Sequence, residues 1–226
     1  MTHLIAVLCE KGGTKKTFLS VHLTEALRAR RANVAIADVD FLNSGLIPQI
    51  FPDALRVNPL YRTELLELFT RIKEGQSVVL DGGANVGFRL FEFLKEEEPV
   101  LAEDLHRAGV RVTVIVPLSG DAKALKSPSI YRDMFPHAEF IMAFPRHMGD
   151  DFEADPVVAP PGFTDCPAFD IPPAPPALVR AYLKHRRSFN YIAGAQEPAF
   201  AELRPFAIEY LEQLNKQFEN ILPQFS

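Results

Sequence analysis

The chain has 226 residues, of which 47% are hydrophobic and 23% charged, so it is long enough for one full-sized core and lacks the composition of a disordered chain. Its 24 basic and 29 acidic residues give a net charge of -5, so contact with nucleic acid would need a local basic patch. Two cysteines, Cys9 and Cys166, exclude a disulfide framework. No apolar run approaches the roughly 20 residues that span a bilayer, and the N-terminus does not resemble a signal peptide, so we expect a soluble cytoplasmic protein.

Short apolar runs alternate along the chain with stretches that have helical spacing. The apolar runs are nearly continuous, which is typical of strands buried on both faces of a parallel sheet. They cover residues 4–9, 34–37, 77–80, 110–118 and 140–144. Apolar side chains recur at helical spacing in the stretches 17–27, 65–72 and 86–94. This alternation predicts an α/β domain with a mostly parallel central sheet flanked by helices.

The regular alternation ends near Pro145. Residues 145–176 hold nine prolines, and proline lacks the backbone N–H that a central strand or a long helix needs. We expect an irregular acidic surface segment there, or a lid or partner-binding loop. Helical segments are predicted over 177–187 and about 198–222. The chain is therefore predicted to be one domain, residues 1–226, with a motif-bearing core (1–145), a proline-rich acidic loop (146–176) and C-terminal helices (177–226).

The most informative residues follow the first apolar run. The sequence Glu10-Lys-Gly-Gly-Thr-Lys-Lys-Thr17 leads directly into a predicted helix. A strand, a glycine turn, a Lys-Thr pair and a helix start form, in that order, a loop whose backbone N–H groups can cradle a phosphate. In this arrangement Lys16 neutralises the outer phosphates and the Thr17 hydroxyl ligates Mg²⁺. The alternative is a glycine turn beside solvated lysines.

Residues 11–17 resemble K-G-G-x-G-K-[ST], the deviant Walker A motif of the ParA/MinD superfamily of P-loop ATPases. Glu10 stands at the first glycine of the general motif, a position that is often not glycine in this superfamily. Lys15 stands where the second glycine belongs. If that position needs a positive φ, a lysine there costs about 1 kcal/mol or more and places a long side chain beside the phosphates. The resemblance implies the P-loop NTPase three-layer fold, with ATP or ADP and Mg²⁺ as ligands.

The same resemblance implies which residues contact the nucleotide. They are Lys11, Gly12, Gly13, Thr14, Lys15, Lys16, Thr17 and Phe18. It also implies a nucleotide-dependent homodimer in which Lys11 reaches the partner's nucleotide, where a second cation would offset charge on the γ-phosphate in the transition state. In this superfamily the base often lies near the end of a late strand and the loop after it, which leaves 144–146 and 171–173 as alternatives.

Acidic residues end two further apolar runs. Asp38-Val-Asp40 resembles the D-x-D element of the superfamily, by which Asp40 would orient the attacking water and Asp38 would support the water shell of the metal. Two acidic residues that cap a turn are the alternative. Asp81 follows apolar residues in the Walker B pattern and is predicted to hold Mg²⁺ through water. The tail after Asp81 looks closer to the TraL and StbB type proteins of conjugative transfer and plasmid stability.

Two basic clusters stand against the acidic background. They are Arg28, Arg30 and Arg31, and Arg180, Lys184, His185, Arg186 and Arg187. Arg180, Lys184 and Arg187 have the spacing of one helix face. ParA-type proteins bind DNA through C-terminal basic residues, so the resemblance makes the second cluster the candidate for DNA, with a solvated face as the alternative. The last predicted helix carries more glutamate than lysine, which disfavours a membrane surface and favours packing against the domain or a partner.

These features lead to a functional hypothesis. We expect a Mg²⁺-ATP-dependent, dimerising molecular switch with slow ATP hydrolysis, acting with a protein partner in plasmid or chromosome partitioning or in conjugative transfer. Its catalytic residues are Lys11, Lys16 and Asp40, and its metal residues are Thr17, Asp38 and Asp81. The alternative is a nucleotide-binding scaffold with little or no turnover, because Lys15 could impair hydrolysis. A kinase or metal-transfer ATPase of the same fold is a third possibility, although no cysteine pair supports metal delivery.

Overall fold

The computed structural model describes the chain apart from residues 31–32, 40–45, 85, 147–156, 220 and 222–226. In the described part, seven strands form one sheet in the order β3-β2-β4-β1-β5-β6-β7, and every neighbouring pair is parallel. The strands are β1 (His3–Val7), β2 (Val34–Asp38), β3 (Leu55–Arg56), β4 (Ser77–Asp81), β5 (Arg111–Pro117), β6 (Glu139–Pro145) and β7 (Ala168–Ile171). The predicted parallel α/β fold is confirmed.

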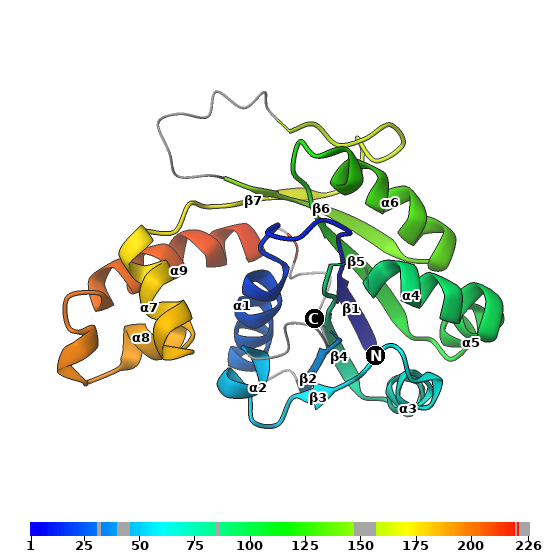
Figure 1. Cartoon of the computed structure of the whole chain (residues 1–226), viewed down its shortest axis with the longest axis horizontal. Coiled ribbons are helices and arrows are strands. Elements are labelled where there is room, and N and C mark those ends of the chain that lie inside the picture. The colour runs from blue at the N-terminus through cyan, green and yellow to red at the C-terminus, as the bar shows by residue number, and fades with distance from the viewer. Residues whose placement is uncertain (31–32, 40–45, 85, 147–156, 220, 222–226) are drawn as a thin grey trace.

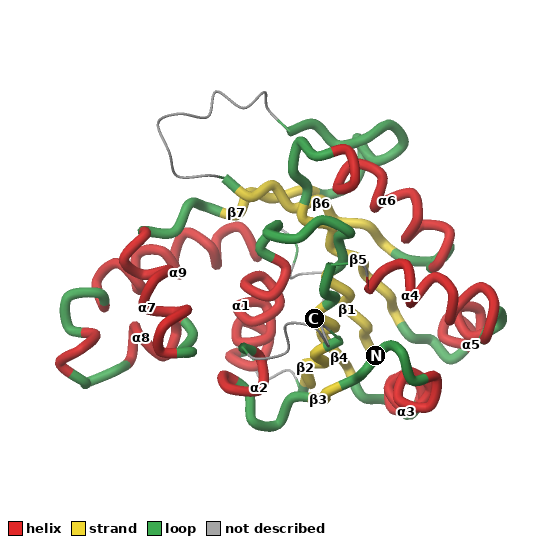
Figure 2. Tube along the Cα trace, in the orientation of Figure 1, coloured by secondary structure: helices red, strands yellow, loops and turns green. Residues whose placement is uncertain are grey.

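Helices cover both faces of the sheet (Figure 1). One layer contains α1 (Lys16–Ala29), α7 (Pro176–His185), α8 (Phe189–Gly194) and α9 (Arg204–Glu219). The other contains α3 (Arg62–Lys73), α4 (Val86–Glu92) with the π-helical turn Phe93–Glu97, α5 (Leu101–Arg107) and α6 (Ala122–Met134). Two short helices, α2 (Ile47–Ile50) and the 3₁₀ turn Pro198–Phe200, complete the set along the described residues. Figure 2 shows the same three layers by secondary structure.

The central strand β1 shows why the apolar runs are nearly continuous. Leu4 and Ala6 pack in the core shared with α3 to α6, whereas Ile5 and Val7 pack in the core shared with α1 and α7 to α9. Because successive side chains of a strand point to opposite faces, a strand covered on both sides needs an apolar residue at every position.

Strand register places the predicted acidic residues at one edge of the sheet. Val7, the last residue of β1, lies opposite Asp81 of β4, and Asp81 lies opposite Asp38 of β2. The loop after β1 therefore begins beside both carboxylates. In open parallel sheets, ligands bind at this carboxyl edge.

Two parts of the sequence-based prediction need correction. The segment expected to be irregular contains the edge strand β7, because Pro167 and Pro172 flank the strand rather than interrupt it. The helix predicted over 177–187 ends at His185, since Arg186 takes a left-handed conformation with φ 53°. Arg187 therefore does not continue the helix face of Arg180 and Lys184, contrary to the prediction.

Candidate functional site

The loop between β1 and α1 closes on itself around one carbonyl. The Lys11 backbone oxygen accepts hydrogen bonds from the Thr14 hydroxyl at 3.1 Å and from the Lys16 ammonium at 2.9 Å. Gly13 has φ 78°, a conformation that glycine adopts without steric cost. No side chain caps the start of α1. The first N–H groups of this helix are thus available to an anion, and the positive end of its dipole favours one.

Asp81 is a buried acidic residue of the site that two hydroxyl groups hold in place. It is 1% exposed, and each of its carboxylate oxygens accepts a hydroxyl hydrogen bond, from Thr17 at 2.8 Å and from Ser20 at 2.6 Å. Burial raises the pKa of Asp81 to about 6, against the opposing effects of the two hydroxyl groups and of the Lys16 charge. Hydroxyl and carboxylate oxygens are the ligands that Mg²⁺ prefers, so these residues fit a magnesium site.

Of the other two predicted acidic residues, Asp38 lies in the described part of the chain and Asp40 does not. Asp38 is 4% exposed at the end of β2, and its charge adds to the rise in the pKa of Asp81. Asp40, predicted to orient the attacking water, lies outside the described residues. The structure thus brings Lys16, Thr17, Asp38 and Asp81 close together.

Lys15 has the backbone conformation that is costly for any residue other than glycine. Its φ is 63° and its ψ is 24°, so the position does need a positive φ. Its ammonium does not fill the phosphate loop, because it donates to the Arg146 backbone oxygen at 3.1 Å, at the end of β6. Burial lowers the pKa of Lys15. Lys15 therefore links the phosphate loop to Arg146, the residue that directly follows β6.

Glu10, at the position of the first glycine, anchors the start of the loop to α6. Its backbone N–H donates to the Ser127 hydroxyl at 3.1 Å, and its carboxylate accepts from the Tyr131 hydroxyl at 2.7 Å. Gly87 of α4 leaves room for this contact. A Cβ at Gly87 would lie 1.9 Å from the Glu10 carboxylate and 2.6 Å from the Tyr131 ring.

Lys11 lies near an acidic residue of its own chain. Its ammonium is 3.6 Å from the carboxylate of Asp121, and both side chains are partly exposed. Asp121 also caps α6 by accepting from the Lys123 backbone N–H at 2.8 Å, which lowers the pKa of the Asp121 carboxyl together with the nearby Lys11 charge. Lys11 is thus accessible at the surface.

An apolar cavity of about 650 Å³ adjoins the phosphate loop. Gly13, Lys15 and Phe18 line it on the loop side. Pro173, Ala174, Pro176, Val179, Arg180, Tyr182, Leu183, Phe189 and Tyr210 complete the lining. Of the two segments considered for the base, only 171–173 contributes to this wall, through Pro173. Its size and aromatic lining suit a heterocyclic base.

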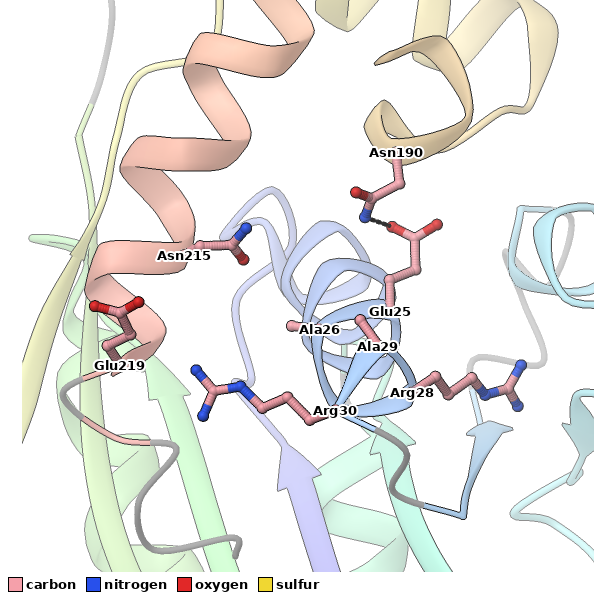
Figure 3. A pocket seen from close by; sticks show the side chains of 8 residues that line it. All are labelled: Glu25, Ala26, Arg28, Ala29, Arg30, Asn190, Asn215 and Glu219. Carbon is pink, nitrogen blue, oxygen red and sulfur yellow. Dashed lines mark hydrogen bonds between the residues drawn. The ribbon is translucent and has the colours of Figure 1, made fainter. Parts of the chain in front are cut away.

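The first basic cluster is engaged in the structure. Arg28 donates to Asp53 at 2.9 Å and to the Val34 backbone oxygen at 3.0 Å. Arg30 lines a separate cavity of about 500 Å³ at the other end of α1, where Asn190 donates to Glu25 at 2.6 Å (Figure 3). Arg31 lies outside the described residues. The described residues of this cluster therefore do not form a continuous basic surface.

The second basic cluster is exposed. Arg180, Lys184, Arg186 and Arg187 all have exposed side chains. Arg187 lies over the Tyr191 ring, 4.7 Å from its centroid. Residues 171–196 contain no aspartate or glutamate, although Glu197 accepts a hydrogen bond from the Tyr191 hydroxyl at 2.5 Å and lies near Arg187.

Sequence reasoning missed three features of the site: the Ser20 contact with Asp81, the Glu10 anchor and the Lys15 tie. Ser20 could have been found, because it follows Thr17 by three residues and shares its helix face. The other two depend on contacts with residues more than 100 positions away along the chain.

Within the described ranges, no group of three or more His, Cys, Asp or Glu side chains could hold a metal ion, and no helix is long and apolar enough to cross a membrane.

Comparisons with known proteins give structural likenesses only. No family model matches the chain, and no curated protein matches its sequence. The MinD cell division protein of Aquifex aeolicus overlays with a TM-score of 0.48 at 11% identity, over 96% of this chain and 97% of that one. The septum site-determining protein MinD of Pyrococcus horikoshii OT3, complexed with Mg-ADP, overlays with a TM-score of 0.47 at 16% identity and the same coverage. Both are MinD proteins. Neither is of the TraL or StbB type, and at these identities neither overlay assigns an activity.

Proposed function

We propose that this protein is a Mg²⁺-ATP-dependent molecular switch of the ParA/MinD kind that hydrolyses ATP slowly. The observation that carries the proposal is the hydrogen bond from Thr17, in the first turn of the uncapped helix α1, to the buried Asp81. It joins the predicted phosphate loop to the predicted Walker B residue. The adjoining apolar cavity supplies a place for the base.

Different residues of the site would bind different parts of a triphosphate and its metal ion. The Lys16 ammonium exchanges the Lys11 carbonyl for phosphate oxygens, while loop N–H groups and the α1 terminus bind the remaining charge. Thr17 would supply a hydroxyl ligand for Mg²⁺, and Asp81 and Asp38 would hold its water shell. Bound Mg²⁺ neutralises charge on the phosphate oxygens.

Two further roles complete the proposed cycle. Asp40 orients the attacking water, and Lys11 reaches the nucleotide of a second copy in a homodimer. Lys11 is available for that role, because its ion pair with Asp121 is long, at 3.6 Å, and is screened by solvent. Plasmid or chromosome partitioning, or conjugative transfer, with a protein partner, is the proposed setting.

The second candidate function is a nucleotide-binding scaffold without turnover, which the strained backbone of Lys15 favours. A measurement of ATP hydrolysis distinguishes the switch from this scaffold. For the switch, we expect phosphate release over hours in the presence of Mg²⁺, and a rate about 100-fold lower for Asp40→Ala. Asp133→Ala, at an exposed position of α6, is the control and should leave the rate unchanged. A wild-type rate equal to that of Asp40→Ala would favour the scaffold.

The exposed cluster on α7 and beyond is proposed as a DNA contact. We expect the wild type to bind duplex DNA in a nucleotide-dependent and salt-sensitive manner, measured by fluorescence anisotropy. Replacing Arg180, Lys184, Arg186 and Arg187 with alanine should weaken binding and lower the salt slope by about 0.9 for each DNA phosphate that the variant no longer neutralises. Alanine at Lys123 and Lys126, exposed on α6 in the other helical layer, should change neither. Equal binding by both variants would refute this contact.

A further inference from the structure

We propose that Ser20 is a positioning residue that orients Asp81 for magnesium. The inference rests on the proposed function, since it concerns the same metal site. Ser20 lies one helical turn after Thr17, is fully buried, and places its hydroxyl oxygen 2.6 Å from Asp81 Oδ1. Thr17 contacts the other oxygen, Oδ2, at 2.8 Å.

The Ser20 proton goes to Asp81 rather than to the backbone. The hydroxyl oxygen of Ser20 also lies 3.1 Å from the Lys16 carbonyl oxygen, but a hydroxyl has one proton to donate. The contact with the carboxylate is 0.5 Å shorter, as expected when the acceptor is ionised. Asp81 is thus held by one hydroxyl on each oxygen, which fixes the plane of its carboxylate.

The two hydroxyl groups have different tasks once a metal is bound. Thr17 is also the proposed magnesium ligand, so the position of its hydroxyl group depends on both the metal and Asp81. Ser20 has no such second task, and its burial removes it from water. Loss of Ser20 would leave Oδ1 buried without this donor and the carboxylate free to turn. Removing a hydrogen-bond partner of a metal ligand typically weakens metal affinity by about 10- to 100-fold, and the low end applies here because Asp81 acts through water.

Metal affinity in the nucleotide complex tests the inference without relying on turnover. We would titrate the full chain, saturated with ADP, with Mn²⁺, which takes the same oxygen ligands as Mg²⁺, and follow free Mn²⁺ by electron paramagnetic resonance. For Ser20→Ala we expect Mn²⁺ affinity up to about 10-fold weaker, well outside the scatter of the Thr24→Val control. ADP affinity measured in EDTA should stay within about twofold of the wild type. The Ser20 hydroxyl donates its proton to Asp81 and to no group that would bind phosphate.

Thr24 provides a matched control on the same helix. Its hydroxyl is equally buried and donates to the Ser20 backbone oxygen at 2.7 Å, one turn further from the loop. Thr24→Val removes this hydroxyl at constant shape, so it should lower the melting temperature as Ser20→Ala does and leave Mn²⁺ affinity unchanged. If Ser20→Ala does not fold, Ser20→Cys, which retains a side chain of similar shape with a weak donor, takes its place.

The outcomes separate the role of Ser20 from the proposed function. Wild-type protein that binds Mn²⁺-ADP tightly, together with a Ser20 variant of equal Mn²⁺ affinity, overturns the role of Ser20 and leaves the proposed function standing. An equal fall in affinity in Thr24→Val also overturns it, since the effect would then be structural. Wild-type protein that binds no ADP, with or without metal, overturns the proposed function and this inference with it.

Discussion

Lys16→Ala is expected to abolish measurable ATP binding, with affinity at least about 100-fold weaker, or about 3 kcal/mol. Lys16 is 7% exposed, and its ammonium sits within the loop on the Lys11 carbonyl, where a bound phosphate would take the place of that carbonyl. Charge-assisted hydrogen bonds to phosphate are strong, and no other cation of the described loop is so deeply buried. Isothermal calorimetry with ATP and Mg²⁺ measures the effect.

The control for this experiment is Lys216→Ala, at an exposed position of α9. It removes the same charge from the protein and should leave ATP affinity unchanged. Both variants should remain folded, because the Lys16 ammonium makes a single hydrogen bond to the chain in the described structure. Unchanged ATP affinity in Lys16→Ala would count decisively against the site.

Gly87→Ala is expected to destabilise the protein by about 2–3 kcal/mol, the range of an overpacked core. The added Cβ would lie 1.9 Å from Glu10 Oε1 and 2.8 Å from the Tyr131 hydroxyl. Glu10 can swing aside only by giving up its hydrogen bond to Tyr131, and Tyr131 is fully buried. Urea denaturation gives the free energy of unfolding, and the same variant should bind ATP more weakly because Glu10 begins the phosphate loop.

Gly194→Ala is the matched control, since Gly194 also lies in a helix and a Cβ there would meet nothing within 4 Å. Alanine is the better helix former, so this variant should be neutral or more stable by up to about 1 kcal/mol. Equal stability of the two variants would show that α4 does not pack closely against the start of the phosphate loop.

The fold was largely predictable because its central strands are covered on both faces. The strands β1, β2, β4, β5 and β6 each appear as an apolar run whose ends lie within two residues of the observed bounds. β3 has two residues and produces no pattern. β7 escaped notice because its apolar residues Phe169 and Ile171 alternate with the less buried Asp170, amid prolines that dominate the local sequence.

The site was predictable where its chemistry follows chain order. The phosphate loop, Asp38 and Asp81 each come directly after a strand, and parallel strands bring such residues to one edge of the sheet. The contacts that cross the fold were not predictable from local pattern. Glu10 meets Tyr131, and Lys15 meets Arg146, only because separate strands and helices are packed side by side.

The Lys15 tie also bears on how a nucleotide leaves. Arg146, whose carbonyl holds the Lys15 ammonium, is itself joined to β7 through Asp170 at 2.9 Å and through the backbone of Ile171. The chain after Ile171 forms part of the lining of the apolar cavity, through Pro173, Ala174 and Pro176. A single side chain, Lys15, therefore links the phosphate loop to the segment that lines this cavity. Under the proposed function, widening the site to release a bound nucleotide would require breaking this hydrogen bond, so the contact would slow nucleotide release.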